Sequence, residues 1–325
     1  MSPSGVRLSP VGVSLIFILS LSFVFYFGSM YYARDMVSMQ ALLVAGIDFA
    51  ERGGVKVKYV HDQGKLDEKS KGETLEGANV PLTDGDLFSN QAMMQSFRKS
   101  FPNVKVVSEE KEAVNLVEDV APAPEFNAEV HKLVTDPLVE VPVDDITIWI
   151  DPLDATQEYT ESLLQFVTTM VCVAVKGKPT IGIVHKPFEK KTYWSWVGHG
   201  SNIDDNSQSD SKSIIVSRSH QGEVESIAHD AFGDDASVIP AGGAGYKSLA
   251  LFEGTASVYV HTTQIKKWDI CAGNAILRHA QGRMTTLHGE EIDYSASGSP
   301  VNNDGLVAAI HNHDVYLEKL GKILR

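Results

Sequence analysis

The hydrophobic pattern begins with a long apolar segment and continues as a series of helix and strand signals. Residues 11–32 contain no charged side chain and lie between Arg7 and Arg34. About 20 apolar residues are enough for a helix to cross a bilayer. Aromatic side chains gather toward the carboxyl end of the segment, as interfacial anchors do. We therefore expect a transmembrane anchor, with a cleaved signal peptide as the alternative because the preceding tail is short.

Beyond this segment, hydrophobic periodicity and helix-breaking residues predict the next elements. The glycines of Arg52-Gly53-Gly54 provide a stop for the first helix, and Pro102 provides one for the second. In chain order we expect a helix over residues 36–50, a mobile loop over 62–77, a helix over 87–101, a strand over 104–107 and an irregular insertion over 111–145.

The middle of the chain is rich in β-branched and aromatic residues. A strand over residues 146–150 stops at Asp151-Pro152, because proline takes the chain off the sheet. Three further runs, at 166–175, 180–185 and 192–197, predict an antiparallel meander. The polar segment 202–212 then separates two halves, 33–200 and 201–325.

The second half alternates between the two kinds of element, which is typical of an α/β protein. The expected strands lie at residues 214–216, 237–239 and 256–261, and the expected helices at 224–232, 246–252 and 268–280.

Composition adds a core and a strong negative charge. Apolar residues make up 43%, which supports a folded core instead of disorder. Lys and Arg number 28 against 42 Asp and Glu, so the net charge is -14. This balance argues against a nucleic-acid polymer as partner. An anionic substrate would need bound divalent cations to supply positive charge.

Two cysteines occur, Cys172 and Cys271, and both have apolar neighbours. We expect both to pack as small apolar residues, since neither has a second cysteine at metal-ligand spacing. A disulfide between them stays possible, and two cysteines do not assign a redox compartment.

A compact acidic motif follows the strand at 146–150. Asp151 ends the strand, Pro152 turns the chain, and Asp154 returns toward the same point, so two carboxylates and the Leu153 carbonyl can converge. A helix from Gln157 onward would aim free N–H groups at a bound phosphate. On its own such a motif is more often a turn with a helix cap.

Two further acidic segments change that interpretation. Glu109-Glu110 ends another expected strand, and Trp268-Asp269 opens an expected helix. Taken singly, they are a solvated pair and a first-turn charge. Together with residues 151–154 they resemble the lithium-sensitive, Mg²⁺-dependent phosphatase superfamily of inositol monophosphatases. The resemblance implies a layered αβαβα sandwich of the α/β (α+β) class.

Four segments are more specifically similar to the nucleotide-specific branch of that superfamily. They are DPLDATQEYT (151–160), VSRSH (216–220), PAGGAGYK (240–247) and IKKWDICAGN (265–274). This resemblance implies Mg²⁺-dependent removal of the 3′-phosphate from adenosine 3′,5′-bisphosphate. It also implies a single-pass type II protein of the Golgi membrane, with residues 1–10 cytosolic and the catalytic region luminal.

The same resemblance implies roles for individual residues. The implied metal ligands are Glu109, Asp151, the Leu153 carbonyl, Asp154 and Asp269. Asp86 and Thr156 would activate the attacking water, with Asp84 as a competing assignment for Asp86. The implied substrate contacts are Ser217, His220, Gly243, Lys247 and Asp269.

Two other functions remain open from the sequence. An inositol phosphate phosphatase would use the same metal ligands, and VSRSH and PAGGAGYK favour the nucleotide over it. An inactive nucleotide-binding protein is the alternative of another class, and the complete set of expected ligands argues against it. The sequence does not predict the oligomeric state.

Overall fold

The computed structural model describes residues 9–32, 34–73, 77, 79–110, 120–204, 212–218, 224–233 and 235–323, with backbone alone at 29–32, 224 and 225. The chain divides into two compact units, Met1–Met36 and Val37–Arg325. The first holds helix α1 (Pro10–Tyr32). Its segment Pro10–Gly28 has a mean hydropathy of 2.2, so it is long and apolar enough to span a membrane, a test that a signal sequence also passes.

The second unit is built around two sheets. The first sheet has six strands in the order β10-β9-β8-β7-β6-β4. Strand β4 is parallel to β6, and the remaining neighbours are antiparallel, which confirms the predicted meander. The strands are β4 (Lys105–Ser108), β6 (Ile146–Asp154), β7 (Thr168–Val175), β8 (Lys178–Lys186), β9 (Lys191–Trp196) and β10 (Gly200–Ser201).

Both faces of this sheet are covered. Ile148 and Val171 pack with α2 (Met39–Asp62) and α3 (Asp84–Ser100), whereas Trp149 and Cys172 face a second core. Successive side chains of a strand point to opposite faces, so strands buried on both sides are continuously apolar. This explains why the middle of the sequence showed β-rich runs without polar alternation.

Helix α2 is longer than predicted, because the glycine pair does not stop it. A Cβ at Gly53 would lie 2.6 Å from Met93 Sδ, and a Cβ at Gly54 would lie 2.5 Å from His185 Cδ2. The glycines therefore let α2 pack closely against α3 and β8. The strand predicted to end at Asp151-Pro152 is also longer, since β6 runs to Asp154 with a register shift between Asp151 and Asp154.

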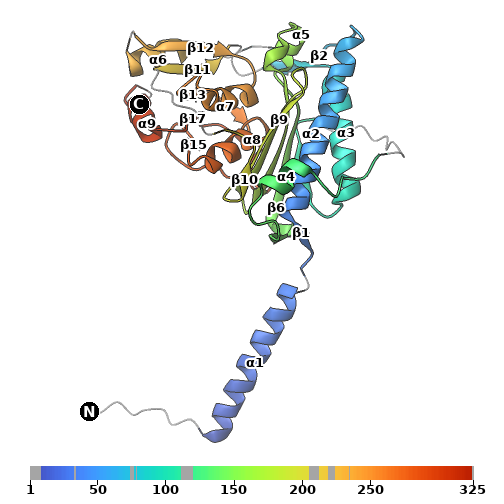
Figure 1. Ribbon diagram of the computed structural model, residues 1–325. Helices are drawn as coiled ribbons and strands as arrows, with labels where there is room; N and C mark the ends of the chain where they lie inside the picture. Colours follow the sequence, from blue (N-terminus) through green and yellow to red (C-terminus); the bar gives the residue numbers. More distant parts are fainter. Residues whose placement is uncertain are drawn as a thin grey trace, which may run out of the picture. The chain divides into compact units, whose positions relative to one another are not determined.

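The second sheet has five strands in the order β12-β11-β13-β17-β15. Its strands are β11 (Ser213–Ser217), β12 (Ser237–Ala241), β13 (Val258–His261), β15 (Arg283–Thr285) and β17 (Leu306–Ala309). Helices α7 (Ala244–Phe252) and α8 (Lys267–His279) lie between the two sheets, and α6 (Val224–Phe232) and α9 (His313–Gly321) cover the outer face (Figure 1). The result is the expected αβαβα sandwich.

Helix α8 is held closely against the first sheet. A Cβ at Gly182 in β8 would lie 2.2 Å from the Ala272 carbonyl oxygen, so only a residue without a side chain permits this approach. A disulfide also joins Cys172 of β7 to Cys271 of α8, with Cα atoms 5.7 Å apart. The expectation that both cysteines only pack as small apolar residues was therefore wrong.

Several short elements complete the unit. The predicted loop at 62–77 was wrong in part, because β2 (Lys69–Glu73) pairs with β3 (Asn79–Leu82) as a hairpin. The predicted insertion at 111–145 contains regular elements, although 111–119 lie outside the described residues. The remaining elements are β1 (Met36–Ser38), α4 (Ala128–Leu133), β5 (Glu140–Pro142), a 3-10 turn (Val143–Asp145), α5 (Thr156–Thr160), a 3-10 turn (Leu164–Phe166), β14 (Ile265–Lys266) and β16 (Val301–Asn302).

Candidate active site

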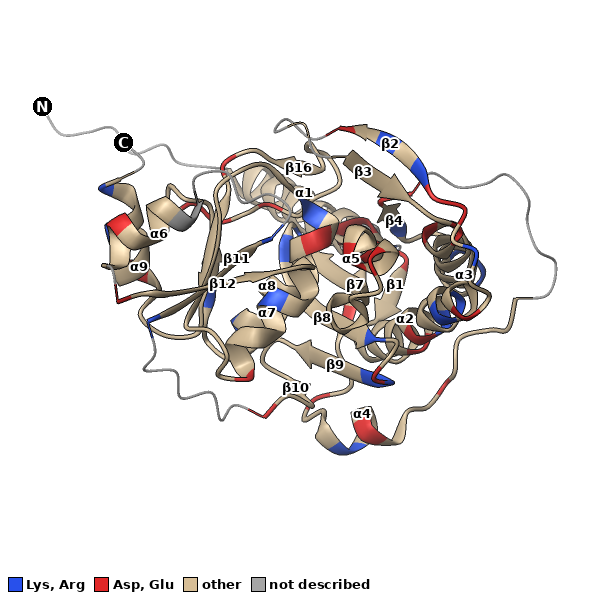
Figure 2. Cartoon of the chain, turned by 90° about the horizontal axis from the view of Figure 1, so that it is seen from above, with Lys and Arg blue, Asp and Glu red and all other residues tan. Residues whose placement is uncertain are grey.

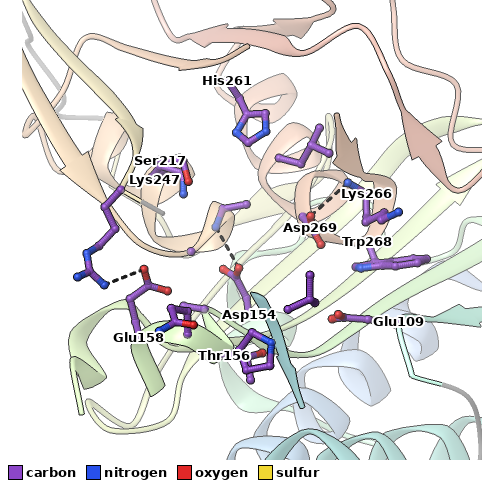
Figure 3. A pocket seen from close by; sticks show the side chains of 18 of the residues that line it. Glu109, Asp154, Thr156, Glu158, Ser217, Lys247, His261, Lys266, Trp268 and Asp269 are labelled. Atoms are coloured by element: carbon purple, nitrogen blue, oxygen red, sulfur yellow. Dashed lines mark hydrogen bonds and ion pairs between the residues drawn. The ribbon is translucent and has the colours of Figure 1, made fainter. Parts of the chain in front are cut away.

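The expected carboxylates come from three elements and approach one cavity. Glu109 follows β4, and its N–H donates to the Ile150 carbonyl (3.2 Å), which places it beside the end of β6. Asp154 lies on β6, and Asp269 lies in the first turn of α8. Glu109, Asp154 and Asp269 line a cavity of about 540 Å³ (Figure 3). Asp151 is not part of the cavity lining and is buried, with 1% of its surface exposed.

The carboxylates repel one another in a buried environment. Burial, and then Glu109, Asp154 and Asp269, hold the pKa of Asp151 well above its usual range. Burial, Glu109 and Asp154 do the same to the pKa of Asp269. Burial raises the pKa of Glu109 to about 7 although Lys71 opposes the shift. The cluster therefore lacks positive charge.

This donor set has the chemistry of a divalent-cation site. Carboxylate and carbonyl oxygens are the ligands that Mg²⁺ prefers. Among the described residues, no three His, Cys, Asp or Glu side chains stand close enough to share one ion. The side chains fit a metal by type and by their mutual repulsion, and they would have to converge further to hold it.

Lys71 supplies part of the missing positive charge. Its Nζ lies 2.7 Å from Glu109 Oε1 and also pairs with Glu110. Burial lowers the pKa of Lys71, but Glu109 and Glu110 raise it further, so the net shift is upward. The sequence pattern does not point to Lys71, because the charged, glycine-containing segment at 62–77 predicts a loop there and not a hairpin.

A hydrogen-bonded pair lies at the edge of the cluster. Thr156 Oγ1 donates to Asp86 Oδ1 (2.9 Å) and lies 3.1 Å from the Leu153 carbonyl oxygen. The N–H and hydroxyl of Thr83 donate to the other Asp86 oxygen. Burial raises the pKa of Asp86 to about 6, and the hydrogen bonds from Thr83 limit the shift.

Asp84 is oriented differently from Asp86. Burial and the neighbouring Asp67 raise the pKa of Asp84, whereas the hydroxyl of Thr156 donates to Asp86. Between the two candidates for activating water, the geometry therefore favours Asp86.

Asp154 also connects β6 to the first turn of α7. Its two oxygens accept hydrogen bonds from the N–H groups of Ala244 (3.0 Å) and Gly245 (2.8 Å). Gly243 has φ +65°, and a Cβ there would lie 2.7 Å from the Phe166 carbonyl oxygen. Glycine is therefore required at this turn. Asp154 thus positions α7 in addition to its expected role as a ligand.

The expected substrate contacts are only partly described. Ser217, Gly243 and Lys247 line the cavity with the carboxylates. Lys247 is buried, and burial lowers its pKa, which Asp154, Glu158 and Asp269 oppose. His220 lies outside the described residues, so its predicted role stays a prediction.

Sequence reasoning missed a second ion pair at the cavity. Arg218 Nη1 lies 2.6 Å from Glu161 Oε2 and 3.3 Å from the buried Glu158 Oε1. The pair links the end of β11 to α5. Arg218 and Glu158 both belong to segments that carry the family resemblance, VSRSH and DPLDATQEYT. Their place in these segments was the sequence signal that could have identified the pair.

Charge elsewhere in the second unit is mixed. Acidic and basic residues lie side by side on α3 and α4 (Figure 2).

Comparison with known proteins gives one consistent family. Residues 39–323 match the model of the inositol monophosphatase family. "Inositol monophosphatase 3" of Danio rerio is 44% identical over 98% of this chain and 98% of the relative. "Golgi-resident adenosine 3′,5′-bisphosphate 3′-phosphatase" of Mus musculus is 44% identical over the same shares.

Solved structures show the same fold. An "IMPase/NADP phosphatase complexed with Mg²⁺ and phosphate" has a TM-score of 0.60 and is 18% identical. It covers 82% of this chain, and the match spans 90% of that chain.

Proposed function

The chain belongs to the inositol monophosphatase family, and we propose that it is a Mg²⁺-dependent phosphatase that hydrolyses adenosine 3′,5′-bisphosphate to AMP and inorganic phosphate. The observation that carries the proposal is the convergence of Glu109, Asp154 and Asp269 on one cavity that also contains Lys247. Acidic ligands can gather metal at one point, while the lysine supplies a cation for a second phosphate.

Glu109, Asp151, the Leu153 carbonyl, Asp154 and Asp269 would hold the metal. When bound, Mg²⁺ neutralises phosphate oxygens and makes water a stronger nucleophile. The raised pKa values of Asp151 and Asp269 support this assignment, because a divalent cation removes the repulsion that raises them.

Thr156 and Asp86 accept the proton of the attacking water. Thr156 Oγ1 donates its proton to Asp86 Oδ1, so its lone pairs are free to accept a proton from water. As the water oxygen attacks phosphorus, its proton passes to Thr156 and that of Thr156 to Asp86. The bond from phosphorus to the ribose 3′ oxygen breaks, that oxygen takes a proton from solvent water, and Asp86 returns its proton to solvent. With a pKa of about 6, Asp86 is anionic at neutral pH and can act as the base.

A nucleotide bisphosphate suits the cavity better than an inositol monophosphate. Lys247, Arg218 and Lys266 line the cavity together with the carboxylates. In a protein of net charge -14, a second phosphate needs such cations to offset the electrostatic repulsion. A single phosphate would need only the cations of the metal site. The relative named for adenosine 3′,5′-bisphosphate is consistent with this choice.

We further propose that the protein is a single-pass type II protein of the Golgi membrane, with its catalytic unit in the lumen. The apolar helix α1 and the Golgi-resident name of the mouse relative support this location. The Cys172–Cys271 disulfide also favours an oxidising compartment. In sealed microsomes, added protease should digest the catalytic unit only after detergent. Digestion without detergent would place that unit in the cytosol.

The activity is tested by phosphate release from the full chain in detergent. The substrates are adenosine 3′,5′-bisphosphate, 3′-AMP and inositol 1-phosphate, each with Mg²⁺ and with excess EDTA. We expect 5′-AMP as the product of the bisphosphate, and no release in EDTA. A higher kcat/KM for inositol 1-phosphate would support the alternative function instead.

A further inference from the structure

One buried hydroxyl group in the cavity wall has no partner. Tyr259 lies on β13, is 0% exposed and lines the cavity. Its phenol oxygen makes no hydrogen bond with any part of the chain that the structure describes. An unpaired buried hydroxyl lowers stability, and phenylalanine would avoid that loss. The hydroxyl is therefore unexplained by the fold alone.

The Tyr259 hydroxyl stays protonated and can donate a hydrogen bond. Burial, followed by the charges of Asp154 and Asp269, raises the pKa of Tyr259 well above its usual range, so the hydroxyl keeps its proton. Tyr259 also lines the same cavity as these two predicted metal ligands. A ligand group that pairs with its hydroxyl must therefore offer an acceptor oxygen inside this cavity.

Lys247 brings a positively charged group close to Tyr259. Its Nζ lies 5.4 Å from the centroid of the Tyr259 ring. Its Nζ donates to the Ala241 carbonyl oxygen over a long distance of 3.4 Å. An ammonium group has three donors, so Lys247 and Tyr259 together can serve several ligand oxygens.

A second donor in the cavity wall is also unsatisfied. The Trp268 Nε1 atom is buried and makes no hydrogen bond with any described residue. Trp268 stands beside Asp269 at the opening of α8 (Figure 3). Unpaired donors on β13 and α8 point to one ligand with several acceptor oxygens, which is the chemistry of a ribose phosphate.

We propose that Tyr259 is a substrate-binding residue whose hydroxyl donates to an oxygen of the nucleotide's ribose phosphate, beside Lys247. This inference rests on the proposed function, since it takes the nucleotide as the ligand. The Lys247 ammonium beside Tyr259 favours a charged phosphate oxygen over the uncharged base at this position.

The test is Tyr259→Phe, which keeps the ring and removes only the unpaired hydroxyl. Binding of 5′-AMP to the full chain with Mg²⁺ is measured by titration calorimetry, and thermal unfolding is measured without ligand. We expect AMP affinity to fall about 10- to 100-fold, as for a hydrogen bond to a charged group. KM for the bisphosphate should rise by a similar factor. The unliganded Tm should be unchanged or higher, since no internal bond is lost.

Tyr294→Phe is the matched control. Tyr294 is also fully buried, but its hydroxyl accepts a hydrogen bond from Asn274 Nδ2 (3.0 Å). This control should lower the Tm and leave AMP affinity unchanged.

Unchanged AMP affinity in Tyr259→Phe would overturn the inference. If the wild type neither binds AMP nor hydrolyses the bisphosphate, the proposed function fails instead, so the two failures are distinguishable.

Discussion

Removal of the Cys172–Cys271 disulfide should cost the catalytic unit a large part of its stability. The two cysteines are 99 residues apart in sequence. Loop-closure entropy for a loop of about 100 residues gives about 4.7 kcal/mol, and measured losses for native disulfides are about 2–5 kcal/mol. The double substitution Cys172→Ala, Cys271→Ala should therefore lower the free energy of unfolding by about 2–5 kcal/mol. At about 2–4 °C per kcal/mol, Tm should fall by about 4–20 °C.

The assay combines thermal unfolding with a count of thiols in denaturant. Wild-type protein should show no free thiol before reduction and two after it, and dithiothreitol should lower its Tm. The double alanine variant is the control, because dithiothreitol should leave its Tm unchanged.

Free packing cysteines would behave differently. Two small buried groups would contribute about 1 kcal/mol each, and the loss would not depend on reductant. Two thiols in unreduced wild-type protein, or equal Tm values for wild type and variant, would refute the reasoning.

Three further predictions concern the cavity. Thr156→Ala should lower kcat about 10²- to 10⁴-fold by removing the path from water to Asp86, while Thr156→Ser should keep most activity; equal rates for both variants would remove the hydroxyl from the reaction. In EDTA, Tm should fall as pH rises from about 4 to about 7. Asp86 (pKa about 6) and Glu109 (pKa about 7) hold their protons more tightly in the folded than in the unfolded protein, so this contribution to stability is complete below their ordinary pKa values and is lost as the two groups ionise. Mg²⁺ should then raise Tm most at the upper end, and calorimetric scans with and without Mg²⁺ that run parallel would contradict this. Lys247→Met should reduce kcat/KM about 10- to 100-fold more for adenosine 3′,5′-bisphosphate than for 3′-AMP, and equal losses would exclude a contact with the second phosphate.

The sequence predicted the strands and the acidic motifs better than the features that depend on contacts between distant segments. The meander was predictable because its strands are continuous β-rich runs joined by short turns. The prediction that Gly53-Gly54 ends the helix was wrong. A glycine pair can end a helix or let it pack closely against its neighbours, and the sequence alone does not show which side chains lie opposite. Lys69–Glu73 contains charged residues and a glycine, so its hairpin gave no strand pattern. Strands β15 and β17 and helix α9 were not predicted.

In the candidate site too, the motifs were predictable and the contacts between distant segments were not. Glu109, Asp154 and Asp269 were predicted from motifs, and the structure brings them to one cavity. The hydrogen bonds of Asp154 to the first turn of α7 join two halves of the chain and could not be predicted from the sequence. The disulfide could not be predicted either, because sequence spacing does not give the 5.7 Å between its Cα atoms.

The close approach at Gly182 affects how natural variants of this protein should be interpreted. A substitution there adds atoms beside the Ala272 carbonyl oxygen, three residues beyond Asp269 in α8. The helix must shift, and Asp269 shifts with it. A genetic screen scored on activity would then rank Gly182 among the essential positions, although it lies outside the cavity lining. Intolerance to substitution at this position would therefore reflect the distance between a helix and a sheet, and such a variant should be classified by its structure before a chemical role is assigned.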